Sequence, residues 1–74
     1  MKEFIEHFTE IFDDLDPATV SENTKFRELE DWDSIAGLSV IGMIDEEYDV
    51  LFNADDMKAC QTVGDLYNRV QSKK

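Results

Sequence analysis

The sequence predicts an all-α fold: a small four-helix bundle of three longer helices and one short helix, with a long first loop. Apolar residues recur at helical spacing in three segments, and capping or helix-breaking residues stand at the ends of these segments. No segment shows a convincing strand alternation, since the best candidate, YDVLFNA at 48–54, is short and lies between predicted helices. A length of 74 residues fits one domain, so we expect residues 1–74 to form a single unit with a thin core.

The first predicted helix runs from Lys2 to Leu15. Six apolar residues at helical spacing form its inward stripe: Phe4, Ile5, Phe8, Ile11, Phe12 and Leu15. The helix is expected to end before Asp16-Pro17, because a residue that precedes proline is disfavoured in the helical region.

Residues 16–33 form the long first loop. Four apolar side chains are expected to pin it to the core: Val20, Phe26, Leu29 and Trp32. A short helix around KFREL, at 25–29, is the alternative interpretation of this segment. Loops of this length are uncommon in small domains and are often functional.

The second long helix begins near Ser34 and continues to Tyr48, with Asp33 as its N-cap residue. Its apolar face is predicted to comprise Ile35, Leu38, Ile41 and Ile44. Gly37 and Gly42 lie inside this helix, where each costs about 1 kcal/mol relative to alanine. Their presence indicates either a slightly weak helix or a close approach of another backbone or of a partner surface.

Two further helices complete the prediction. A short one follows Asn53, which can cap it, and Asp55 and Asp56 stand in its first turn, where the helix dipole favours negative charge. The last helix starts at Thr62, with Asp65 three residues later in the position of a capping box. Its apolar face comprises Val63, Leu66, Tyr67 and Val70.

The charge is concentrated in one region of a chain whose net charge is −11. Residues 28–57 hold ten acids and no lysine or arginine, whereas the other 44 residues hold eight acids and seven bases. Such a surface disfavours nucleic acids and anionic membranes, which attract basic patches. It favours basic partner proteins, although solubility alone is the alternative interpretation.

Composition excludes several classes of protein. The single cysteine, Cys60, cannot form an internal disulfide, which excludes a stapled secreted scaffold. The first residues, MKEFIEHF, predict no signal peptide, and no apolar run approaches the ~20 residues that span a bilayer. We therefore expect a cytoplasmic monomer without stable membrane insertion.

The run DWDSIAGLSVIG resembles the start of a calcium-binding loop. Its glycine falls one place late and no glutamate stands at the twelfth position, so no metal site is expected.

Ser34 raises the question of function, and the residues alone leave three interpretations. It can be a structural first-turn residue, although Asp33 is already able to cap the helix. It can be a hydrolytic nucleophile, but the one histidine, His7, lies on the first helix and G-x-S-x-G is absent, so no catalytic residue is expected. It can be an attachment point, because the N–H groups of a first helical turn are unsatisfied and suit a phosphate ester.

The run DWDSIAGLSVIGMIDEEYDV, at 31–50, resembles the prosthetic-group segment of acyl carrier proteins. The similarity rests on Asp33, Ser34 and Ile35 at the start of the helix and on the acids 45–47 and Tyr48 at its end. DDMKACQTVGDLYNRV, at 55–70, is similar to the end of these proteins. The similarity covers essentially the whole chain: helix, long loop, serine helix, short helix and final helix.

The resemblance implies a carrier and not an enzyme, with 4′-phosphopantetheine attached to Ser34 from coenzyme A by a phosphopantetheinyl transferase, the holo-synthase. The thiol of this arm would hold acyl or aminoacyl intermediates as thioesters, in fatty-acid, polyketide or specialised biosynthesis. The implied partners are acyl-transferring and acyl-modifying enzymes with basic docking surfaces. An acyl chain is expected to lodge between helices, against Leu38, Ile41 and Ala59.

The sequence departs from the family pattern at three positions of the serine helix. Ile35 replaces the usual leucine, and Ala36 and Ser39 stand where fatty-acid carriers typically have Asp and Glu. Trp32 resembles the residue found there in free-standing carriers of specialised pathways, including aminoacyl carriers. The alternatives are therefore an aminoacyl or peptidyl carrier, or an unmodified carrier-like interaction module.

Overall fold

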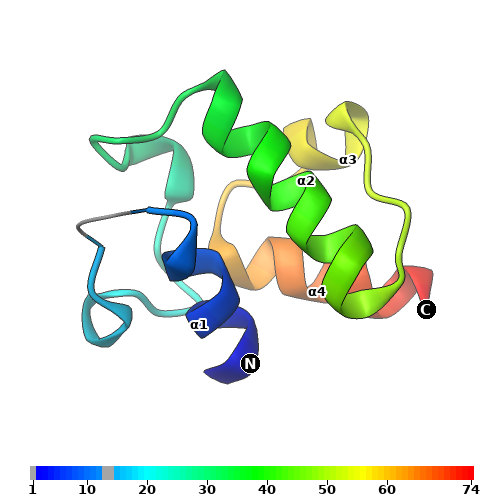
Figure 1. Cartoon of the computed structure of the whole chain (residues 1–74), viewed down its shortest axis with the longest axis horizontal. Coiled ribbons are helices and arrows are strands. Elements are labelled where there is room, and N and C mark those ends of the chain that lie inside the picture. The colour runs from blue at the N-terminus through cyan, green and yellow to red at the C-terminus, as the bar shows by residue number, and fades with distance from the viewer. Residues whose placement is uncertain (1, 13–14) are drawn as a thin grey trace.

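The computed structural model describes residues 2–12 and 15–74, which fold into a bundle of 29 × 24 × 20 Å. Its α-helices are α1 (Lys2–Glu10), α2 (Ser34–Tyr48), α3 (Ala54–Lys58) and α4 (Val63–Lys73). Two single turns of 3₁₀-helix, Pro17–Thr19 and Phe26–Glu28, lie in the first loop. In Figure 1, α2 crosses diagonally over α4, with α1 toward one side and α3 toward the other. The prediction of three longer helices and one short helix is confirmed.

Helix α1 is shorter than the sequence predicts, because it ends at Glu10 and not at Leu15. Beyond Glu10 the backbone tightens, and the N–H groups of Ile11 and Phe12 donate to carbonyls three residues back, at 3.3 and 3.1 Å. This turn buries Phe12 and places its ring 6.2 Å from the Trp32 ring. The helix thus ends well before Pro17, whose effect on the preceding residue was expected to end it. Residues 13–14, which the predicted helix includes, lie outside the described residues.

The core is formed by apolar side chains from all four helices and from the first loop. The largest side chains with almost no exposure are Phe4, Phe8, Phe26, Phe52, Ile44, Leu66, Val40, Val63, Val70 and Cys60. The predicted stripe of α1 and the predicted face of α4 both point inward, with some residues only partly buried at their edges. Of the described helices, none is both long and apolar enough to cross a bilayer.

Four apolar residues pin the first loop to the core, as predicted: Val20 and Phe26 are buried, and Leu29 and Trp32 pack against the core. The loop is also bonded to the start of α4. Lys25 and Thr62 form an isolated antiparallel bridge. The alternative helix around KFREL is right only in part, since one 3₁₀ turn forms there.

The N–H groups of Val63 and Gly64 donate to the carbonyls of Thr24 and Glu22, at 2.9 and 2.8 Å. A Cβ atom at position 64 would lie 2.8 Å from the Glu22 carbonyl oxygen, so the loop and the helix can meet in this way only at a glycine.

Helix α2 begins and ends as predicted but presents a different face to the core. Ile35 and Leu38, predicted to be inward, are 72% and 68% exposed. The residues that α2 buries are Ala36, Val40, Met43 and Ile44, while Ile41 packs at the edge. The first eleven residues of α2 carry no charge, so hydrophobic periodicity could not identify the inward face.

Asp56 ties α3 to α4. Its buried carboxylate lies 2.7 Å from the Arg69 Nε and 2.9 Å from the Lys73 Nζ. Burial alone would raise the pKa of Asp56, but hydrogen bonds from Lys73, Arg69 and the backbone N–H of Asn53 outweigh burial and lower the pKa to about 2. Asp56 also completes a capping box with Asn53, so one ionised carboxylate orders the start of α3 and fixes that helix against α4.

Candidate functional site at the start of α2

Ser34 is the first residue of α2, and its side chain is exposed. Asp33 provides the predicted N-cap: its backbone is extended, and its carboxylate accepts a hydrogen bond from the Ala36 N–H at 2.8 Å. Since Asp33 caps the helix, the Ser34 hydroxyl is not needed for capping. Among the described residues, no hydrogen bond to this hydroxyl is found.

The backbone N–H groups of Ser34 and Ile35 point out of the helix end. They precede the first intrahelical hydrogen bond, and the part of the chain that the structure describes offers them no acceptor. The first turn of α2 contains no acidic residue. The positive end of the helix dipole therefore faces the space around Ser34, where an anionic ester would be stabilised.

An apolar groove of about 490 Å³ opens beside Ser34, between α2 and α3. Five side chains form its apolar walls: Trp32, Leu38, Ile41, Ala54 and Met57. Asp33, Ser34 and Lys58 supply its polar groups. The attachment residue that the sequence suggests thus stands at the edge of a cavity able to receive an apolar chain.

Two of the three residues predicted to contact an acyl chain lie at this groove, whereas acyl binding itself stays a prediction. Leu38 and Ile41 line this groove, but Ala59 lies in a different, polar depression with Cys60 and Arg69. Helix α3 ends at Lys58, and Ala59, its C-cap residue, belongs to the turn toward α4. This turn could not be predicted from the sequence, because its position depends on how α3 packs against α4.

Trp32 both anchors the loop and forms a wall of the groove. Its ring meets the Phe26 ring edge-on, with centroids 4.8 Å apart.

The two glycines of α2, Gly37 and Gly42, have room around them. A Cβ at position 37 would lie 3.7 Å from the Trp32 indole, in ordinary contact, and a Cβ at position 42 would meet nothing within 4 Å. The predicted close approach of another backbone is therefore wrong at both glycines, whereas contact of this helix with a partner stays a prediction.

Among the described residues, none is paired with Ser34 as a catalytic base. The His7 Nε2 lies 3.7 Å from a Glu47 carboxylate oxygen, at the far end of α2. At a rise of about 1.5 Å per residue, this end lies roughly 20 Å from Ser34. In the described residues, no group of three or more histidine, cysteine or acidic side chains is arranged to hold a metal ion.

Cys60 is not an alternative point of attachment. Its side chain is 1% exposed, and burial raises the pKa of its thiol. A buried and protonated thiol reacts poorly with an acyl donor.

A comparison with protein families finds a match over most of the chain. The family model described as a phosphopantetheine attachment site matches residues 3–70. This match confirms the resemblance of the chain to the acyl carrier protein family. No curated protein sequence matches the chain.

Proposed function

The chain belongs to the family of phosphopantetheine attachment-site domains, and on this premise we propose that Ser34 carries the 4′-phosphopantetheine group. Members of this family are carrier proteins that bind the group covalently. The observation that carries the proposal is an exposed hydroxyl at the start of α2, beside an apolar groove and two N–H groups for which the described residues offer no acceptor.

The other serines fit the group less well. The Ser72 hydroxyl donates to the Arg69 carbonyl at 2.9 Å, and the Ser21 oxygen accepts from the Asn23 N–H at 3.2 Å. Ser39 is exposed but lies in the second turn of α2, where backbone N–H groups are bonded within the helix. Only Ser34 combines an accessible hydroxyl with open donors for a phosphate.

The residues around Ser34 have separate roles in this proposal. The Ser34 oxygen forms the bond to phosphorus and loses its proton to the transferase, while the phosphoanhydride of coenzyme A breaks and adenosine 3′,5′-bisphosphate leaves. The open N–H groups and the dipole of α2 stabilise the negative charge of the ester. When bound, the group supplies a thiol that holds the cargo as a thioester.

An acyl chain is the cargo that the groove favours. Apolar walls would stabilise a bound chain by about 0.8 kcal/mol for each buried methylene group. An aminoacyl cargo, the alternative, carries a charged ammonium group that such walls cannot solvate. We propose that the carrier acts in the cytoplasm, in fatty-acid, polyketide or a specialised biosynthetic pathway.

The exposed surface of α2 suggests the chemistry of the partner enzymes. Ile35 and Leu38 expose apolar surface next to Ser34, and no acid lies between Ser34 and Ile44. Acids are frequent on either side of this stretch, within 28–33 and 45–49. Acyl-transferring and acyl-modifying enzymes that dock here would combine an apolar contact with flanking basic patches.

Attachment can be tested with coenzyme A, a broad-specificity phosphopantetheinyl transferase and mass spectrometry of the intact protein. We expect the wild-type mass to rise by one phosphopantetheine group. Ser34→Ala should abolish this rise, and the matched variant Ser39→Ala, in the same helix, should retain it. An unchanged wild-type mass, with a known carrier modified in parallel, contradicts the proposal.

The cargo can be tested by loading the modified protein with an acetyl, an octanoyl or an aminoacyl group. The octanoyl form should have the highest melting temperature, because it alone buries a chain in the groove. Leu38→Ala should reduce this gain, whereas Leu51→Ala should not, since Leu51 is exposed but does not line the groove. Equal melting temperatures for the three forms would exclude the groove as an acyl site.

An unmodified interaction module is the remaining alternative, motivated by the departures at Ile35, Ala36 and Ser39. In that case Ser34→Ala would leave the cellular function intact, whereas a carrier would lose it.

A further inference from the structure

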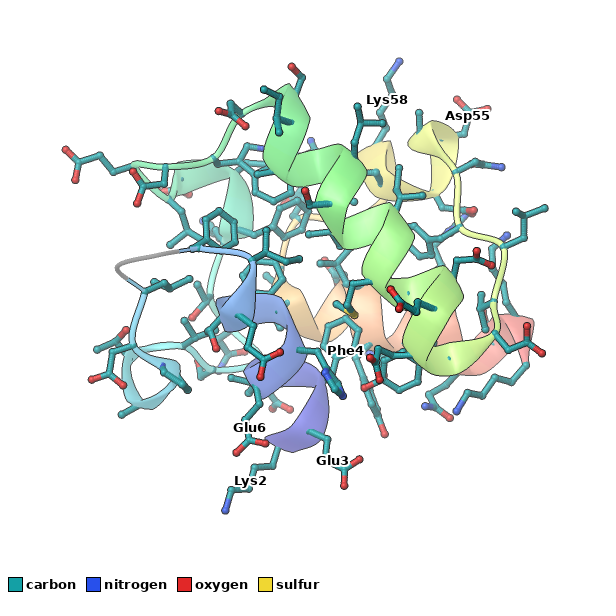
Figure 2. The ribbon with its side chains drawn as sticks, in the orientation of Figure 1. Lys2, Glu3, Phe4, Glu6, Asp55 and Lys58 are labelled. Carbon is teal, nitrogen blue, oxygen red and sulfur yellow. The ribbon has the colours of Figure 1, made fainter. Side chains whose placement is uncertain are left out.

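Lys58 is the basic residue among those that line the groove beside Ser34. It is the last residue of α3 and the first base after the acidic region 28–57. Its side chain is exposed and lies beside the first half of α2 in Figure 2. A cation in this position faces a site that would receive a negatively charged ester.

Most other basic residues already have partners. Five of them are engaged, through Lys25 with Glu28, Arg27 with the Met57 carbonyl, Arg69 and Lys73 with Asp56, and Lys74 with the Tyr48 ring. For Lys58, the described residues provide no hydrogen bond or ion pair. Asp55 stands on the same helix, but no ion pair between Asp55 and Lys58 is found in the described part of the chain. The Lys58 ammonium group is therefore available to an anion at the groove.

A phosphodiester on Ser34 would add a negative charge to acidic surroundings. Asp33 lines the same groove, and Glu30 and Asp31 precede it in an exposed stretch. Repulsion from these carboxylates opposes the charge of the ester, and the open N–H groups of α2 offset this repulsion on one side only. The Lys58 ammonium group can offset this repulsion from the other wall of the groove, which α3 forms.

We propose that Lys58 is a positioning residue that pairs with the phosphodiester on Ser34. The inference rests on the proposed attachment at Ser34. The phosphate then lies between the N–H groups at the start of α2 and the ammonium group of α3. This pairing directs the first segment of the arm along the groove, and the cargo on its thiol follows.

A cycle of four proteins tests the pairing: wild type and Lys58→Gln, each without the group and with the group bearing a free thiol. The free thiol leaves the phosphodiester as the added anion. Attachment shifts the melting temperature of each protein. The shift of the wild type should be more positive than that of Lys58→Gln by about 1–4 °C at low salt. The difference should shrink in high salt, as expected for an exposed ion pair.

Two further variants serve as controls. Lys2→Gln removes the same charge at the opposite end of the molecule, where Figure 2 shows Lys2, and should behave like the wild type. Lys58→Arg keeps the charge and should restore most of the difference.

Equal effects of attachment on the wild type and on Lys58→Gln would overturn the pairing. A difference that arises only after loading with a dicarboxylic acyl group would also overturn it, since Lys58 would then bind the cargo. Failure of attachment itself is detected separately, as an unchanged mass of the wild-type protein, and would refute the attachment at Ser34 as well.

Discussion

Helices α2 and α4 begin with the same local arrangement in different surroundings. In each, the side chain before the helix accepts a hydrogen bond from the third helical residue: Asp33 from Ala36, and Thr62 from Asp65. At α4, the first two N–H groups, of Val63 and Gly64, are bonded to loop carbonyls. At α2, the described residues leave the corresponding N–H groups of Ser34 and Ile35 without acceptors.

This difference distinguishes a structural helix start from one that is open to a ligand. The start of α4 is closed by the first loop, and α3 carries Asp55 and Asp56 in its own first turn. The first turn of α2 contains no acid, and no segment among the described residues bonds to its open N–H groups. Its donors and its dipole therefore remain available to an external anion.

Helix α4, whose start is covered by the first loop, is joined to α3 through Asp56. This residue holds one wall of the groove against α4, while the opposite side of α3 faces α2. The groove beside Ser34 therefore depends on the ion pairs of Asp56, because these pairs fix the position of α3, which forms one of its walls.

The largest effect is expected from Asp56→Ala. The substitution leaves Arg69 and Lys73 without their shared partner and removes half of a capping box. Both cationic side chains are partly exposed, so we expect a loss of about 3 kcal/mol, at the lower end for a broken buried pair. Urea denaturation measures this loss. Asp55→Ala, a matched change at an exposed neighbour, should cost much less, and equal losses would refute the role of the ion pairs.

The same interaction should depend on pH. The pKa of Asp56 is lowered from 3.8 to about 2 in the folded protein, so its stabilising effect is present above about pH 4 and is lost as the pH falls toward 2. Hydrogen bonds from the Gln61 and Thr62 backbones also lower the pKa of Asp65, which adds to the acid sensitivity. The difference in unfolding free energy between wild type and Asp56→Ala should therefore be constant near neutral pH and decrease in acid. A constant difference down to pH ~2 would contradict this assignment.

A smaller loss is expected from Gly64→Ala, which would place a Cβ 2.8 Å from the Glu22 carbonyl oxygen. Separating the loop from α4 should cost about 2 kcal/mol, as in other overpacked sites. Gly37→Ala is the matched change at the start of α2, where a Cβ makes only ordinary contact with Trp32. It should stabilise the protein by up to about 1 kcal/mol through helix propensity. Thermal denaturation that ranks the two variants in the reverse order would contradict the comparison.

Local signals in the sequence were sufficient for the helix starts. Asp33, Asn53 and Thr62 are capping residues whose partners lie three residues away, so the chain itself determines these boundaries. The end of α1 at Glu10 was predicted wrongly because the apolar spacing continues past it, while the backbone tightens to bring Phe12 to Trp32.

Features that depend on tertiary packing could not be predicted. The early part of α2 is apolar on every side, and only packing decides that Ala36 is buried and Leu38 exposed. The one glycine in close contact is Gly64, whose neighbour Glu22 is distant in sequence. Lys58 was likewise missed at the site, because its place beside Ser34 follows from how α3 is fixed.

The smallest effect on stability is expected from Ser34→Ala, and it tests the comparison most directly. Thr62→Ala removes the cap of α4 and should cost about 1 kcal/mol. Ser34→Ala removes an exposed hydroxyl at a helix that Asp33 already caps, so the unmodified protein should change by less than about 0.5 kcal/mol. Denaturant titration of both variants measures the two losses in unfolding free energy. Equal losses would mean that the Ser34 hydroxyl supports the helix, whereas a neutral Ser34→Ala leaves the serine dispensable for folding and thus available for attachment.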